Sequence, residues 1–129
     1  MSKFALLKIE AVKGKQKFYK LEKDGKCKFD DFENEARRSY SKELFRIYAL
    51  MDKVSDMQTL TKEQFRDITP KGDLTKEYEF KTHNLRVYAI HEAHTGKIIV
   101  LGGFKNTQNQ DINKFRELKK QYLLEGTGK

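Results

Sequence analysis

Four side chains in the second half of the chain are of types that can cleave a phosphodiester bond. They are Lys81, Arg86, Tyr88 and Lys105. An arginine stays charged and its planar fork grips phosphate oxygens, so Arg86 is the candidate for stabilising charge in a transition state. A lysine acts as a base only where neighbouring cations or burial lower its pKa, which makes Lys81 or Lys105 the candidate base. Tyr88 is a possible proton donor, or a surface on which a base stacks.

RNA cleavage without a metal ion needs the functions that these residue types supply. The 2′-hydroxyl must lose its proton, the charge on the pentacoordinate phosphate must be stabilised, and the leaving 5′-oxygen must be protonated. Ordinary roles remain open: Arg86 and Tyr88 could be a solvent-facing strand pair, Lys105 a surface cation, and Thr107 is better explained as a helix cap. The three histidines are further acid–base candidates, with His91 expected to face inward or end a strand: His83, His91 and His94.

Alternation along residues 85–90 decides which of these side chains can meet. If the Leu85, Val87 and Ala89 face of this strand packs on helices, Arg86 and Tyr88 emerge together on the opposite face. The continuous apolar run at residues 98–101 is typical of a central strand, and the glycine pair after it indicates a bulge or a close backbone approach.

Helical periodicity appears in the middle of the chain and at its end. Asp30 and Asp31 can open a first helix, and Ser41 can cap a second, whose apolar stripe comprises Leu44, Ile47, Tyr48, Met51 and Val54. A final helix is predicted from about Asn109 to Leu124, begun by a capping box at residues 107–110, with an apolar face of Ile112, Phe115, Leu118 and Tyr122. Predicted RNA-binding cations lie on the rest of this helix and in an earlier loop: Lys114, Lys119, Lys120 and Lys71.

Strand-like segments flank the predicted helical centre. Residues 4–12 and 17–22 favour β structure, as a hairpin or as one strand with an extended lead. Residues 55–76 lose clear periodicity and are predicted to be a loop with a short turn at Phe65 to Ile68. The 129 residues suit one domain.

Charge is distributed unevenly along the chain, whose net charge is +8. Residues 1–28 carry nine lysines against three acids, residues 29–78 nine basic against eleven acidic residues, and residues 79–129 nine against five. If both basic ends belong to one sheet, their cations can converge into a surface that attracts a polyanion such as RNA. A Lys-rich solvated surface is the alternative.

Several classes of protein are disfavoured by the sequence. Cys27 is the single cysteine, so no intrachain disulfide can form and a reducing compartment is favoured. The first twelve residues alternate apolar and polar types, unlike a signal peptide or a membrane span, which predicts a cytoplasmic protein. No histidine and carboxylate set has metal-ligand spacing and no glycine-rich nucleotide loop is present, so neither a metal nor a cofactor is predicted.

The order of these motifs resembles the RelE/ParE superfamily of toxins, in particular the phage-derived HigB-like branch of type II toxin–antitoxin systems. The resemblance covers roughly residues 17 to 123 and is carried by Phe18-Tyr19 with Asp24-Gly25, Glu79-Phe80-Lys81, Arg86-Val87-Tyr88 and Phe104-Lys105-Asn106-Thr107. It implies an α+β fold, with an antiparallel twisted sheet of about four to five strands packed against two helices from the first half and a C-terminal amphipathic helix. Residues 1–16 would form an N-terminal strand extension of this domain of residues 1–129.

The resemblance also implies an activity: endonucleolytic cleavage of mRNA on the ribosome, neutralised by a bound antitoxin. Lys81, Arg86, Tyr88 and Lys105 would then be the catalytic residues. Three other functions stay open at this point. They are a toxin of the same fold that poisons DNA gyrase, a non-catalytic module that binds nucleic acid or protein, and an inert structural protein.

Overall fold

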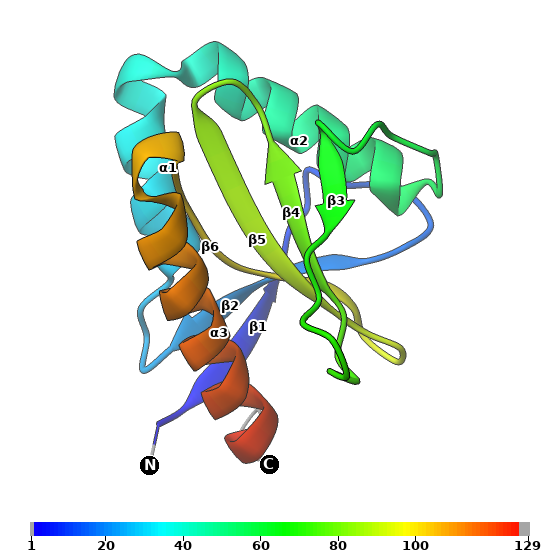
Figure 1. Ribbon diagram of the computed structural model, residues 1–129, viewed down its shortest axis with the longest axis vertical. Coiled ribbons are helices and arrows are strands. Elements are labelled where there is room, and N and C mark those ends of the chain that lie inside the picture. The colour runs from blue at the N-terminus through cyan, green and yellow to red at the C-terminus, as the bar shows by residue number, and fades with distance from the viewer. Residues whose placement is uncertain (1, 127–129) are drawn as a thin grey trace.

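The computed structural model describes residues 2–126 as one mixed sheet with helices on both faces (Figure 1). The elements in chain order are β1 (Phe4–Lys8), β2 (Phe18–Lys23), α1 (Lys28–Ser39), α2 (Ser41–Ser55), β3 (Phe65–Asp67), β4 (Glu77–Lys81), β5 (Leu85–Glu92), β6 (Gly96–Phe104), a 3₁₀ turn (Lys105–Thr107) and α3 (Gln108–Glu125). The predicted domain of residues 1–129 and its extension of residues 1–16 include Met1 and residues 127–129, which lie outside the described residues.

The predicted sheet of four to five antiparallel strands is wrong. Six strands are present in the order β1-β2-β6-β5-β4-β3, and β2 runs parallel to β6. The number of strands was underestimated partly because residues 65–68 were predicted to be a turn. Phe65–Asp67 instead form a strand that pairs with β4. The parallel pair could not be predicted from alternation, because alternation specifies which face a side chain occupies and not the direction of the neighbouring strand.

One face of the sheet packs against α1 and α2. The predicted stripe of α2 is confirmed, since Leu44, Ile47, Met51 and Val54 are buried and Tyr48 packs against them. They join the β5 residues Leu85, Val87 and Ala89, so the predicted strand parity is confirmed as well. Burial of this apolar stripe is what holds the helical pair onto the sheet.

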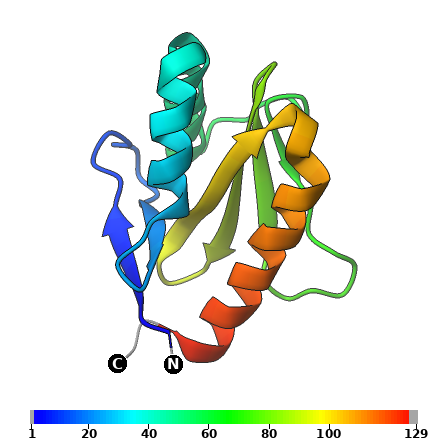
Figure 2. The same cartoon turned by 90° about the vertical axis from the view of Figure 1, so that its left-hand side faces the viewer.

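The other face of the sheet is covered by α3 (Figure 2). The predicted apolar face of this helix is confirmed: Phe115 and Tyr122 are buried, with Ile112 and Leu118 packed beside them. A register shift between β5 and β6 at Tyr88/Ala89 places both Val100 and Leu101 toward α3. The bulge lies at Val100 and not at the glycine pair, which pairs regularly with Val87 and Arg86; the two glycines instead mark a close approach, by Phe32 to Gly102 and by Asp111 to Gly103.

The predicted capping box of α3 is not formed. Thr107 occupies the N-cap position without a side-chain bond to the helix backbone, and its hydroxyl instead donates to Asp111 Oδ2 at 2.7 Å. No helix described between residues 2 and 126 combines the length and the apolar character needed to cross a bilayer.

Candidate functional site

Three predicted site residues converge at one end of the sheet. The Cα atoms of Lys81 and Arg86 are partners between β4 and β5, and Arg86 is in turn the partner of Gly103 in β6. Lys105 follows β6, where its backbone N–H donates to the carbonyl of Asn84 at 3.0 Å. We call Lys81, Arg86 and Lys105 the cationic corner. They lie where the β4–β5 turn meets the start of α3.

The β4–β5 turn at this corner is held by a carboxylate from α2. Glu43 accepts hydrogen bonds from the Thr82 hydroxyl at 2.5 Å and from the Asn84 backbone N–H and side-chain amide at 2.7 Å each. Burial acts to raise the pKa of Glu43, but these bonds outweigh it and the pKa is lowered. The turn that carries the corner is therefore anchored to the helical layer.

Arg86 lies deeper than predicted. Its side chain projects to the α3 face of the sheet, as the parity requires, but only 6% of the residue is exposed. Its Nη1 donates to the carbonyls of Thr82 at 2.6 Å and Leu85 at 2.9 Å, whereas its buried Nε has no hydrogen-bond partner. Arg86 thus stabilises the turn and keeps one donor unused.

Tyr88 does not emerge beside Arg86 on an open face, so the predicted exposure of this pair is wrong. The residue is completely buried, and its ring stacks on Phe115 of α3 with 5.5 Å between ring centroids. Burial raises the pKa of its hydroxyl, which has no hydrogen-bond partner. With α3 in this position, no nucleotide base can reach the Tyr88 ring.

The predicted RNA-binding lysines do not gather around the corner. Lys114 is exposed on the flank of α3 that faces α1, while Lys71 is exposed in the loop that precedes β4. Lys120 is exposed twelve residues after the start of α3, roughly 18 Å along the helix from the corner. These three cations therefore do not form one surface with Lys81 and Lys105.

Lys119 is the clearest departure from the predicted cationic surface. Only 4% of it is exposed, and its ammonium donates to Asp73 at 2.8 Å, Glu77 at 2.8 Å and the Thr75 carbonyl at 2.9 Å. Arg116 donates to the other oxygen of Glu77 at 3.0 Å. All three ammonium donors of Lys119 are used inside the protein, so its charge is not offered to RNA.

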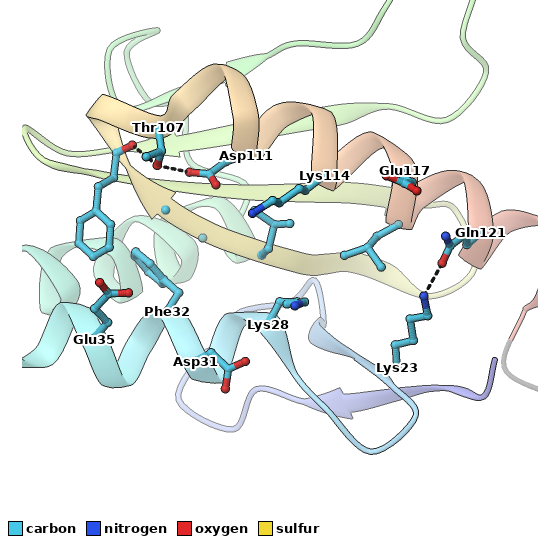
Figure 3. Close-up of a pocket in the computed structure, with 15 residues that line it drawn as sticks. Lys23, Lys28, Asp31, Phe32, Glu35, Thr107, Asp111, Lys114, Glu117 and Gln121 are labelled. Carbon is cyan, nitrogen blue, oxygen red and sulfur yellow. Dashed lines mark hydrogen bonds between the residues drawn. The ribbon is translucent and has the colours of Figure 1, made fainter.

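A groove lies on the opposite flank of α3, between α3 and α1 (Figure 3). Its volume is about 530 Å³, and its floor is formed by residues 101–104 of β6. Three lysines and four acids line it: Lys23, Lys28, Lys114, Asp31, Glu35, Asp111 and Glu117. Lining charges of both signs make this groove a poor match for a polyanion. Among residues 2–126, no group of three or more histidine, cysteine, aspartate or glutamate side chains is arranged to hold a metal ion.

A buried lysine that no sequence pattern predicted lies at the other end of β6. Lys97 is 6% exposed, and its ammonium lies 3.0 Å from Gln16 Oε1, 3.3 Å from His91 Nδ1 and 4.8 Å from the centroid of the Tyr78 ring. No carboxylate within the described residues forms an ion pair with it. Burial lowers the pKa of Lys97 to about 8, and burial also lowers the pKa of His91.

Lys97 is expected to make stability depend on alkaline pH. The ammonium has a pKa of 10.5 in the unfolded chain and about 8 in the folded protein, so folding releases a proton between these values. Titration of Lys97 alone should therefore raise the free energy of unfolding by on the order of 3 kcal/mol as the pH increases from 8 to 10.5, against the opposite effect of Tyr48, Tyr88 and Tyr122, whose pKa values burial raises. Urea unfolding of the wild type and of Lys97→Met, measured between pH 8 and 10.5, tests this contribution of Lys97. The variant should lack the rise, and parallel profiles would contradict the assignment.

Comparison with known proteins adds no assignment: no family model, curated protein or solved structure matches this chain.

Proposed function

We propose that this chain is the toxin of a type II toxin–antitoxin module and a metal-independent endonuclease that cleaves mRNA on the ribosome. The observation that carries the proposal is the cationic corner, where Lys81, Arg86 and Lys105 come from three separate segments of the fold. Each of these three cations lies in a motif that resembles the RelE/ParE-type toxins. The proposed setting is the cytoplasm, with a cognate antitoxin as the partner.

The corner offers groups for two of the three chemical tasks. Lys105 is exposed and Lys81 half-buried, and no carboxylate in the described structure forms an ion pair with either, so both are free to approach a 2′-hydroxyl. The Nε of Arg86 has no partner and could donate to a phosphate oxygen, but it is buried, so the phosphate must first displace the side chains that cover it. Lys105 also opens the turn that leads into α3, and the positive end of a helix dipole favours a phosphate there.

Inducible expression in a bacterium, with and without the neighbouring open reading frame, tests the proposal when followed by mapping of RNA 5′ ends. Growth arrest that the neighbour relieves, with cuts inside translated codons, is the expected result. The double variant Lys81→Ala/Lys105→Ala should abolish the cuts. Its matched control is Lys62→Ala/Lys53→Ala, since both of these lysines are exposed and lie outside the corner.

The other results of this experiment select other functions. Growth arrest without cleavage, together with binding to DNA gyrase, would select a gyrase-targeting toxin. Salt-dependent RNA binding that requires the corner but yields no cuts would select a non-catalytic module. Harmless expression in the absence of any partner would reject the toxin proposal.

A further inference from the structure

Strand β6 is longer than the strand beside it. β2 pairs with β6 only from Lys97 to Ile99, and beyond that point β2 pairs with β1 alone. Residues 100–104 of β6 therefore have β5 on one side and no strand on the other. Five residues of open edge span roughly 16 Å, which is the length of an ordinary short strand.

The free backbone groups of this edge point into the groove between α1 and α3. In an antiparallel ladder, residues alternately direct their N–H and C=O toward the partner and away from it. The backbone N–H of Lys105 donates to Asn84 across the β5–β6 ladder. Because the direction alternates along the strand, Phe104 and Gly102 direct their backbone N–H and C=O groups away from β5. The Phe104 carbonyl begins the 3₁₀ turn and lies 3.3 Å from the Thr107 hydroxyl, whereas no bond to the Phe104 N–H or to the Gly102 N–H and carbonyl is found in the described structure.

Helices wall this open edge on both sides (Figure 2). Phe32 of α1 lies against Gly102, where an added Cβ would come within 2.4 Å of its ring. Asp111 of α3 lies against Gly103, where an added Cβ would come within 1.9 Å of its carboxylate. The two glycines thus let both helices approach β6 closely, and they leave the edge itself as the floor of the groove.

The charges on the two walls are partly ordered along the groove (Figure 3). Glu35 and Asp111 lie toward the end marked by Thr107 and Lys23 toward the end marked by Gln121, whereas Lys28 and Lys114 lie between them. Glu117 near Lys23 and Asp31 near Lys28 add two acids to that half of the groove. None of the seven charged lining residues forms an ion pair within the described residues. On the other flank of α3, by contrast, Arg116 and Lys119 are both paired with the buried Glu77. The groove therefore presents unpaired charge of both signs.

We propose that the open edge of β6 is the docking site for an extended segment of a partner protein, which adds a strand to the sheet inside this groove. The segment would carry an acidic side chain near Lys23 and Lys28 and a basic one near Glu35 and Asp111. Its backbone would bond to Gly102 and Phe104, and its alternate side chains would face α1 and α3. This docking site does not depend on the ribonuclease proposal.

The observations favour a polypeptide over the other possible occupants. The floor offers both donors and acceptors at strand spacing, which a peptide backbone matches and an RNA backbone does not. The four acids of the lining repel a polyanion. A second copy of this chain has two outer strands to offer: β3 is only three residues long, and β1 (Phe4–Lys8) contains no acidic side chain to meet Lys23 and Lys28.

A display library of random peptides of about eight residues, selected on the folded full-length protein, tests the docking site. Selected peptides should bind about tenfold more weakly to Lys28→Glu and to Glu35→Lys, which reverse one charge of each sign in the groove. The exposed pair Lys62→Glu and Glu63→Lys is the matched control and should bind as the wild type does. Lys28 and Glu35 are both exposed, so these variants should fold normally.

Backbone pairing gives a second readout with the best selected peptide. N-methylation of alternate residues in one register should abolish binding, while methylation in the other register should leave it intact, because a strand offers only every second amide to its neighbour. Exchange of the Gly102 and Phe104 amides should slow by about tenfold or more in the complex. No groove-dependent peptide, equal effects of the two registers, or single-stranded RNA that binds through Lys28 and Glu35 would each overturn the proposal.

Discussion

Glu77→Ala is expected to remove about 3 kcal/mol or more from the free energy of unfolding. Glu77 is 1% exposed and accepts from both Arg116 and Lys119, so its loss leaves a buried ammonium with only Asp73 as its acid. Breaking a buried ion pair from one side is strongly destabilising, because the remaining charge stays desolvated. Urea unfolding followed by circular dichroism measures the effect.

The control for this change is a carboxylate on the exposed flank of α3, the helix that carries Arg116 and Lys119. Glu117→Ala removes a carboxylate that forms no ion pair within the described residues, so its effect should stay within about 0.5 kcal/mol. Replacing the whole set by Glu77→Leu/Lys119→Met should recover much of the stability lost by Glu77→Ala, because no unpaired charge remains. If Glu77→Ala proved as stable as Glu117→Ala, the buried network would not be what fixes α3 on the sheet.

Arg86→Lys is expected to lower ribosome-dependent cleavage by about a hundredfold, provided that the proposed activity is correct. A lysine keeps the positive charge but lacks the planar fork, so it cannot bond the turn carbonyls and a phosphate oxygen together. The loss of stability should be small, about 1 kcal/mol, because an ammonium can still reach one carbonyl. Cleavage is measured by primer extension on mRNA with purified ribosomes, alongside thermal unfolding of the same preparation.

The structure makes lysine a better test at this position than alanine. Arg86→Ala would remove both bonds to the Thr82 and Leu85 carbonyls, so lost folding could be mistaken for lost chemistry. Arg46→Lys on the exposed surface of α2 is the matched control and should retain full cleavage. Unchanged cleavage by Arg86→Lys would leave Arg86 as a support for the turn alone.

The local elements were predictable because their signals are local. Alternation gave the faces of β5, and the 3.6-residue period gave the buried sides of α2 and α3. From Leu85 to Ile90, both faces of β5 are buried and apolar apart from Arg86, since Tyr88 and Ile90 lie opposite Val87 and Ala89. That pattern was the signal that a second layer covers the strand, and its use would have predicted α3 over the Tyr88 face.

The candidate site was predictable only where it follows strand register. Lys81, Arg86 and Lys105 converge because the ends of adjacent strands meet at one edge, whereas the direction of Lys119 depends on Asp73 and Glu77 from a distant segment. Periodicity along α3 shows that position 119 is polar, but it cannot show that the Lys119 ammonium donates to the buried Glu77 of β4. The groove was unpredictable for a related reason: it exists because β2 stops pairing with β6 at Ile99.

The parallel contact between β2 and β6 also bears on how the protein is made. Phe18 of β2 and Lys97 of β6 are partners, so roughly 80 residues are synthesised after β2 before its partner strand exists. The segment from β3 to β6 pairs neighbour with neighbour and can form early, whereas joining β1 and β2 to it requires a long loop to close. Pairing of β2 with β6 is therefore expected to limit the folding rate. On the ribosome, the amino-terminal hairpin must wait until β6 has left the exit tunnel.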